Sequence, residues 1–149
     1  MKAWRYEVRF AETLGDKAYG PRMNANIREL DDLVKTVVGA AYEVSNVLGA
    51  GFLEKVYERA LVHELVLRGL NVRSQATFPV GYKGQCVGEY VADLLIEDKL
   101  IVELKCVDQF SNEHLAQCIN YLKASGMKLA LLINFQKPRV EWKRVVYSS

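Results

Sequence analysis

Residues 89–105 read EYVADLLIEDKLIVELK. Two apolar segments, 91–96 and 100–104, flank the charged turn Glu97-Asp98-Lys99. Short runs rich in Val, Ile and Leu around a tight polar break are typical of two paired β-strands. The stretch therefore predicts a β-hairpin, and the remaining elements of the chain are placed around it.

Three charged residues, Asp93, Glu103 and Lys105, interrupt the apolar pattern of this hairpin. A carboxylate in an apolar strand loses hydration, so it needs a hydrogen-bond donor, a countercharge or a metal ion. Glu103 and Lys105 are two residues apart and share one face of a strand, and a turn at 97–99 brings Asp93 level with Glu103. Paired carboxylates suit Mg²⁺ or Mn²⁺. An isolated Glu-x-Lys triplet is, however, more often part of an ordinary surface hairpin.

Length and composition predict one globular domain. The chain has 149 residues, of which 50% are hydrophobic and 26% charged. No apolar run is long enough to cross a membrane, and the N-terminal MKAWRYEVRF lacks the apolar core of a signal peptide, so we expect a cytoplasmic protein. The three cysteines, Cys86, Cys106 and Cys118, have no metal-ligand spacing, and we expect them to be small buried residues rather than disulfides or ligands.

The order of expected elements predicts an α/β fold with a central mixed sheet flanked by helices. Residues 1–28 are assigned to an N-terminal arm or edge strand, because apolar and charged residues alternate over 4–10, and residues 29–149 to a single domain. Apolar periodicity, glycines and caps predict, in order, helices at about 29–48 and 53–68, strands at 72–82, 86–96 and 99–106, a helix from 111 or 112 to about 124, a central strand at 129–134 and a last strand at 140–147.

A second pattern lies at the start of the second predicted helix. Gly51, Glu54 and Tyr57 are spaced by three residues, which predicts one shared side of its first turns. Glu54 there is explained either by the positive helix N-terminus or by a role as a further metal-site carboxylate reaching toward the sheet.

A third pattern lies on the third predicted helix. Gln117 and Tyr121 are four residues apart and face the same way, with His114 close to that face. Such side chains can hydrogen-bond phosphate or orient the lysine, or they can simply belong to an amphipathic helix.

Taken together and in this order, the three patterns resemble the PD-(D/E)XK nuclease superfamily, and the QxxxY element resembles its exonuclease-like branch. More closely, the chain is similar to the small bacterial GxxExxY proteins, predicted nucleases of that superfamily. The resemblance runs from about residue 30 to 147 and is carried by LGAGFLEKVYERAL (48–61), FPVGYKG (78–84), ADLLIEDKLIVELK (92–105), EHLAQCINYLK (113–123) and LLINF (131–135).

The resemblance implies a restriction-endonuclease-like core and a role for each matching residue. Asp93, Glu103 and Glu54 become metal-site acids, with the backbone carbonyl of Leu104 as an extra ligand. It makes Lys105 the catalytic lysine and places the supporting residues Gln117 and Tyr121 near the substrate. There are two departures: Ala92 stands where the superfamily's name has proline, and Ser45 stands where the family often has histidine.

The C-terminal part of the chain is basic. Residues 121–149 hold six Lys or Arg against one acid, Glu141. This distribution suits either a solvated surface or the binding of a polyanion. On charge alone we expect Arg139, Lys143 and Arg144 to contact a phosphate backbone.

The sequence thus predicts a nuclease dependent on Mg²⁺ or Mn²⁺ that hydrolyses phosphodiester bonds, with DNA favoured over RNA as substrate and no membrane partner. The alternatives are a nucleic-acid-binding or regulatory module that keeps the fold but has little or no activity, and a subunit that cuts only with a partner. A homodimer or a larger complex with a helicase would suit so small a core.

Overall fold

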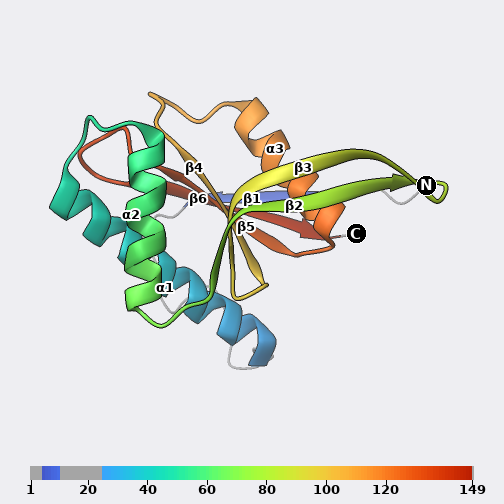
Figure 1. The fold of residues 1–149 in the computed structure, drawn as a ribbon, viewed down its shortest axis with the longest axis horizontal. Helices are drawn as coiled ribbons and strands as arrows, with labels where there is room; N and C mark the ends of the chain where they lie inside the picture. The colour runs from blue at the N-terminus through green and yellow to red at the C-terminus, as the bar shows by residue number, and fades with distance from the viewer. Residues whose placement is uncertain (1–4, 11–24, 149) are drawn as a thin grey trace.

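The computed structural model describes residues 5–10 and 25–148 and contains one six-stranded sheet with strand order β1-β6-β5-β4-β3-β2 (Figure 1). Strands β4 and β5 are parallel, and the other neighbours are antiparallel. In chain order the elements are β1 (Arg5–Phe10), α1 (Ala25–Leu48), α2 (Glu54–Leu67), β2 (Val72–Tyr82), β3 (Gln85–Ile96), β4 (Leu100–Lys105), α3 (Asn112–Ser125), β5 (Leu129–Asn134) and β6 (Glu141–Ser148).

The expected α/β fold, with a mixed sheet flanked by helices, is confirmed. Of residues 1–28, assigned to an arm or an edge strand, 5–10 form β1, which pairs with β6 at the edge of the sheet, while 1–4 and 11–24 lie outside the described residues. Helix α1 begins at Ala25 rather than near Glu29. The extra turn is exposed, so no apolar periodicity marked it in the sequence.

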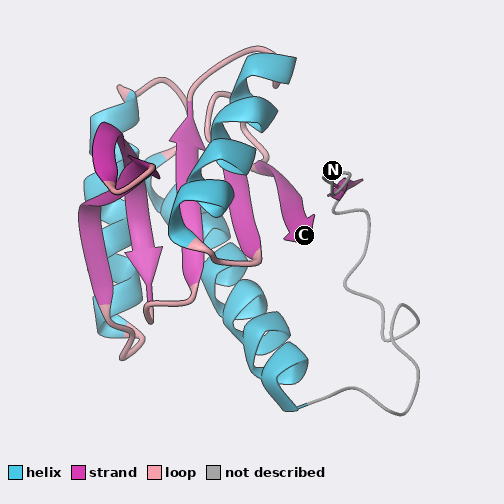
Figure 2. Ribbon diagram, turned by 90° about the vertical axis from the view of Figure 1, so that its right-hand side faces the viewer, coloured by secondary structure: helices cyan, strands magenta, loops and turns pink. Residues whose placement is uncertain are grey.

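The helices lie on opposite faces of the sheet, α1 and α2 on one and α3 on the other (Figure 2). Strand residues alternate between the two cores: Leu131 and Ile133 of β5 pack toward α1 and α2, whereas Leu132 packs toward α3. β5 is buried along its whole length, as expected for a central strand. Among the described helices, none is both long and apolar enough to cross a membrane.

The hairpin of β3 and β4 has the predicted register, but its ladder is short. Glu97 and Asp98 both have positive φ (53° and 54°), which matches the tight turn that joins twisted strands. Only residues 94–96 pair with 100–102, so β3 and β4 separate just before Asp93 and Glu103. From this point β3 continues with β2 as a long two-stranded ribbon, in which residues 85–91 of β3 are exposed.

The expectation that all three cysteines are buried is wrong for Cys86. Cys118 is buried and Cys106 half-buried, but Cys86 lies on the exposed ribbon. Its place at a turn between two strands gave no sign that the hairpin extends beyond the sheet. All three thiols are free, as expected.

An ion pair joins α1 to β6. The Arg144 guanidinium lies 2.6 Å from Asp31 Oδ1, and the two side chains are only 11% and 15% exposed. Little solvent reaches this pair, so each charge depends on the other for the solvation it has lost. Arg144, expected in the nucleic-acid interface, is thus engaged in holding a helix against the sheet.

Arg144→Met should lower the free energy of unfolding by about 3 kcal/mol, because the half-buried Asp31 carboxylate is left without this partner. Urea denaturation measures this. Lys99→Met is the matched control, because Lys99 pairs with Glu29 of α1 while both side chains are more than half exposed, and it should cost under about 0.5 kcal/mol. Equal effects in the two variants would contradict a structural role for the Arg144 pair.

Candidate active site

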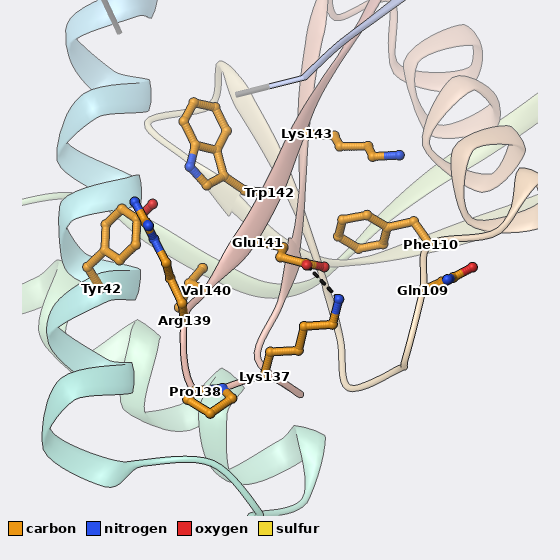
Figure 3. A pocket seen from close by; sticks show the side chains of 10 residues that line it. All are labelled: Tyr42, Gln109, Phe110, Lys137, Pro138, Arg139, Val140, Glu141, Trp142 and Lys143. Carbon is orange, nitrogen blue, oxygen red and sulfur yellow. Dashed lines mark hydrogen bonds and ion pairs between the residues drawn. The ribbon is translucent and has the colours of Figure 1, made fainter. Parts of the chain in front are cut away.

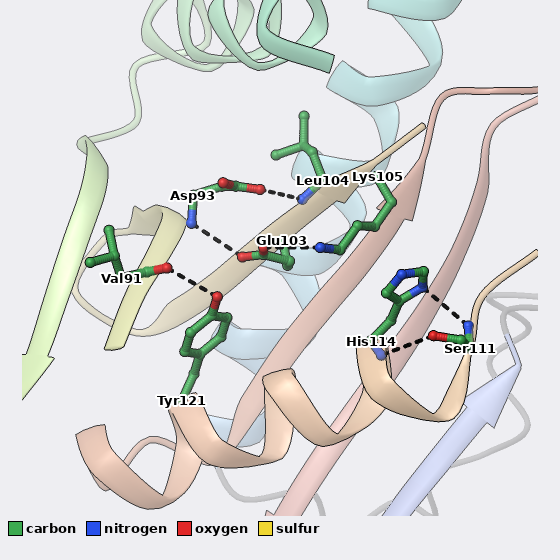
Figure 4. Close-up of polar contacts among 8 residues, drawn as sticks. All are labelled: Val91, Asp93, Glu103, Leu104, Lys105, Ser111, His114 and Tyr121. Atoms are coloured by element: carbon green, nitrogen blue, oxygen red, sulfur yellow. Dashed lines mark hydrogen bonds and ion pairs between the residues drawn. The ribbon is translucent and has the colours of Figure 1, made fainter. Parts of the chain in front are cut away.

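Asp93 and Glu103 are joined by a reciprocal pair of hydrogen bonds at the point where β3 and β4 separate (Figure 4). The backbone N–H of Asp93 donates to Glu103 Oε2 at 3.2 Å, and the N–H of Leu104 donates to Asp93 Oδ2 at 2.8 Å. Each carboxylate therefore accepts a bond from a backbone group of the opposite strand. The two acids replace the strand-to-strand bonds that end at Leu94 and Val102, and both side chains are fixed as a result.

Lys105 and Tyr121 surround the Glu103 carboxylate. The Lys105 ammonium lies 3.6 Å from Glu103 Oε1, on the face that their two-residue spacing predicts. The phenol of Tyr121, from α3, donates to the carbonyl of Val91 at 3.0 Å and lies close enough to Glu103 to lower the pKa of that carboxyl. The structure thus brings Asp93, Glu103, Lys105 and Tyr121 together.

Both acids have raised pKa values. Burial raises the pKa of Glu103 to about 7, and the neighbouring Asp93 charge adds to the effect, while hydrogen bonding and Lys105 oppose it. Burial also raises the pKa of Asp93, against the stabilising N–H of Leu104. Glu103 is only 4% exposed. The pair is therefore short of positive charge, which a cation would supply.

Glu54 approaches the pair from α2, at whose first position it lies. Partial burial raises its pKa, the Asp93 carboxylate raises it further, and Lys105 and the backbone N–H of Cys106 act in the opposite sense. Glu54 is therefore near enough to Asp93 and Lys105 to feel both charges, and its role in a metal site stays a prediction. Gly51, however, precedes the helix instead of sharing its first turns.

Gly51 and Tyr57 act by shaping the turn before α2. Gly51 has φ of 107°, which an L-residue with a side chain adopts only with strain. The Tyr57 hydroxyl donates to the Gly49 carbonyl at 2.6 Å and accepts from the N–H of Phe52 at 3.2 Å, and its ring stacks on Phe135 with centroids 4.8 Å apart. The glycine and tyrosine of this pattern therefore fix where α2, and with it Glu54, begins.

Glu58 is a site residue that the sequence analysis missed. It is only 5% exposed, and its charge raises the pKa of both Asp93 and Glu54. Gln75 Nε2 donates to Glu58 Oε1 at 2.9 Å, and Lys55 Nζ donates to Oε2 at 3.2 Å. Gln75 lies in β2 with φ of 53°, at the level of Asp93, and has no backbone partner in the β2–β3 ladder. The four-residue spacing of Glu54 and Glu58 was the available signal.

The remaining expected residues lie at various distances from this centre. Gln117 is half-buried on α3, and its side chain makes no hydrogen bond to another described residue. His114 completes a capping box with Ser111, and burial together with the Lys105 charge lowers its pKa. Leu104 packs its side chain into the core, so its backbone is the part that faces the site. Ser45 is buried on α1, and its hydroxyl donates to the carbonyl of Pro138 at 3.3 Å.

The donor set fits a hard divalent cation. Within the described residues, no three or more His, Cys, Asp or Glu side chains are grouped closely enough to hold a metal ion by themselves. Mg²⁺, however, binds through one or two carboxylates and keeps several waters. Asp93 and Glu103 meet that requirement, and burial, which raises the pKa of both carboxyls, is a cost to their ionised forms that a bound cation would offset.

The raised pKa of Glu103 predicts that the metal-free protein loses stability as pH rises. The folded state binds a proton at Glu103 up to about pH 7, whereas the unfolded state releases it near 4.5. With respect to this group, the folded state is therefore most stable below about pH 4.5. The free energy of unfolding then falls as pH rises from about 4.5 to about 7. Glu103→Gln should remove this slope and be more stable than the parent by on the order of 2 kcal/mol at pH 8, measured by urea denaturation in EDTA. A parallel pH profile in the variant would contradict this.

Two substitutions at Gln75 distinguish the contribution of its side-chain hydrogen bond to stability from the cost of its positive φ. Gln75→Ala should cost about 1–2 kcal/mol, because buried Glu58 loses a hydrogen-bond donor. Gln75→Gly removes the same side chain but relieves the positive φ, so it should be about 1 kcal/mol more stable than the alanine variant. Thermal unfolding measures both. A glycine variant less stable than the alanine variant would show that the positive φ carries no strain.

Comparison with known proteins supports the family that the residues suggest. The sequence profile described as PD-(D/E)XK nuclease superfamily matches residues 31–145. No curated protein matches the chain. The crystal structure of SSO0001 is similar with a TM-score of 0.46 and 18% identity, covering 80% of this chain and 60% of that one. The GxxExxY branch stays a prediction. The sequence profile spans most of the chain, including all the residues placed at this centre. The chain therefore belongs to the PD-(D/E)XK nuclease superfamily.

Proposed function

We propose that this chain hydrolyses phosphodiester bonds in DNA at the centre formed by Asp93, Glu103 and Lys105. The observation that carries the proposal is the reciprocal bonding of the two acids, with a lysine ammonium beside them. One buried and one half-buried carboxylate, each held by a backbone hydrogen bond, form a preorganised acidic centre. Membership of a nuclease superfamily supports the same conclusion.

Asp93 and Glu103 would hold a Mg²⁺ or Mn²⁺ ion with the carbonyl of Leu104, and Glu54, which is not grouped closely enough with them to form a three-carboxylate site, would add its negative charge from α2. When bound, such an ion lowers the pKa of a coordinated water and polarises the phosphate. Asp93 and Glu103 would have lower pKa values beside a cation, so both acids would stay ionised at neutral pH.

Lys105 would act on the substrate itself. Its ammonium lies 3.6 Å from Glu103 Oε1, and its side chain is 17% exposed. From this position it can orient the attacking water or offset charge that develops on the phosphate. Tyr121 would position Glu103 and the start of the β2–β3 ribbon through its bond to Val91, and Gln117 has amide groups available to a phosphate on the same side of α3.

Cleavage assays with Lys105→Ala test this function. Labelled single- and double-stranded DNA, incubated with the parent protein in Mn²⁺, should be cut, and Lys105→Ala should cut at least about 100-fold more slowly. Lys128→Ala, which removes an exposed lysine at the opposite end of β5, is the control and should cut like the parent. Calorimetric titration of Mn²⁺ should give a binding signal that Asp93→Asn weakens.

Two outcomes would overturn the proposal. Binding of DNA by the parent without cleavage in Mg²⁺ or Mn²⁺ would favour a nucleic-acid-binding module. Cleavage that persists in Lys105→Ala at the parental rate would place the reaction elsewhere or assign it to a contaminant.

A further inference from the structure

A groove of about 820 Å³ lies beside the acidic centre, between α1, the loop that follows β4, and the turn that joins β5 to β6 (Figure 3). Its side chains are mainly aromatic and basic. They are Tyr42, Gln109, Phe110, Lys137, Pro138, Arg139, Val140, Glu141, Trp142 and Lys143.

The charge of the groove is positive. It contains three basic side chains and one acid, Glu141, and that acid pairs with Lys137 at 2.7 Å. Arg139 is exposed and makes no ion pair with another described residue. The Lys143 ammonium lies 5.3 Å from the centroid of the Phe110 ring. An anionic ligand is therefore favoured here, in contrast to the acidic centre next to it.

Phe110 is the aromatic ring best placed to meet a ligand. Trp142 is only 8% exposed and forms the wall of the groove, whereas Phe110 is half-buried. In Figure 3 its ring lies next to the side chain of Lys143, and the paired side chains of Glu141 and Lys137 lie on its other side. A ring with an ammonium group beside it suits nucleotides, because a base can stack on the ring while a phosphate meets the cation.

The groove is connected to the acidic centre through His114. The Phe110 and His114 rings meet edge to face with centroids 6.5 Å apart. The Lys105 charge, after burial, lowers the pKa of His114. Phe110 follows β4 by five residues, so the strand that carries Glu103 and Lys105 leads directly into the groove. A chain of nucleotides cut at Lys105 therefore has a basic surface within reach.

The walls of the groove are held in place by buried polar contacts. Asn134, at the end of β5, accepts from the N–H of Val107 at 3.1 Å and donates to the carbonyl of Val107 at 2.7 Å. It also accepts from the N–H of Gln136. The loop that carries Phe110 is thus tied to the turn that carries Lys137 and Arg139, so the groove is formed before any ligand arrives.

We propose that this groove binds an unpaired nucleic-acid strand, with a base stacked on Phe110 and phosphates at Arg139 and Lys143. Bases inside a duplex are stacked on their neighbours and offer no face to a protein ring, so Phe110 selects single-stranded nucleic acid. The inference rests on the proposed function for its substrate class, and it adds strand preference and the path that the strand takes.

Binding in EDTA tests the inference without relying on cleavage. Fluorescence anisotropy with a labelled oligo-dT and with a duplex of equal length should show that Phe110→Ala weakens single-strand binding roughly tenfold and duplex binding by less than about twofold. Phe110→Tyr should restore single-strand binding, which separates loss of stacking from loss of folding. Arg139→Ala should lower the salt dependence of single-strand affinity by about 0.7 in the slope of log K against log salt, while Lys128→Ala at the far end of β5 should leave affinity at low salt within about twofold.

Equal losses for single strand and duplex in Phe110→Ala would overturn the inference, as would unchanged single-strand affinity. Competition by poly-glutamate as effective as that by unlabelled oligo-dT would also overturn it, because it would mean that the groove recognises charge alone. If DNA is bound in this way but never cleaved, the strand site stands and the hydrolytic function fails. If DNA is cleaved but Phe110→Ala binds normally, the reverse holds.

Discussion

The structure of the centre depends on the separation of β3 from β4. Their ladder ends at Leu94 and Val102, and the next backbone N–H groups, of Asp93 and Leu104, lose the strand partners that a regular hairpin would give them. The carboxylates of Glu103 and Asp93 accept these two bonds. A buried N–H without an acceptor is costly, and so is a buried carboxylate without a donor, so each requirement satisfies the other. The two acids are held in one position by backbone geometry.

The negative charge that gathers at this separation is balanced only in part. Glu54 and Glu58 add two more carboxylates from α2, while Lys105 and Lys55 supply the cations near them. The raised pKa values of Asp93 and Glu103 are the consequence. Replacing these partly buried acids with apolar residues would increase the stability of the fold. Groups that are retained at such a cost, with perturbed pKa values, are typical of functional sites.

In the proposed function, the acidic centre and the basic groove would act on the same nucleic-acid strand. Phosphates are repelled by the uncompensated acids and attracted by Arg139 and Lys143, so a bound cation would make the two regions continuous for a polyanion. Two contacts hold the wall of the groove formed by α1 and β6. They are the Asp31–Arg144 ion pair and the hydrogen bond from Ser45 to the carbonyl of Pro138. Residues far from the centre thereby set the shape of the surface beside it.

The sequence by itself determined the elements and most of the centre. Apolar periodicity placed the helices and strands, because burial of one face imposes a fixed spacing on each type of element. Two-residue spacing and a tight turn sufficed to bring Asp93, Glu103 and Lys105 together. Only the tertiary structure decided the rest. Glu58 and Gln75 meet across 17 residues, Arg144 and Asp31 across 113, and Cys86 is exposed because the ribbon leaves the sheet. These outcomes depend on how separate elements pack, and local spacing carries no information about that packing.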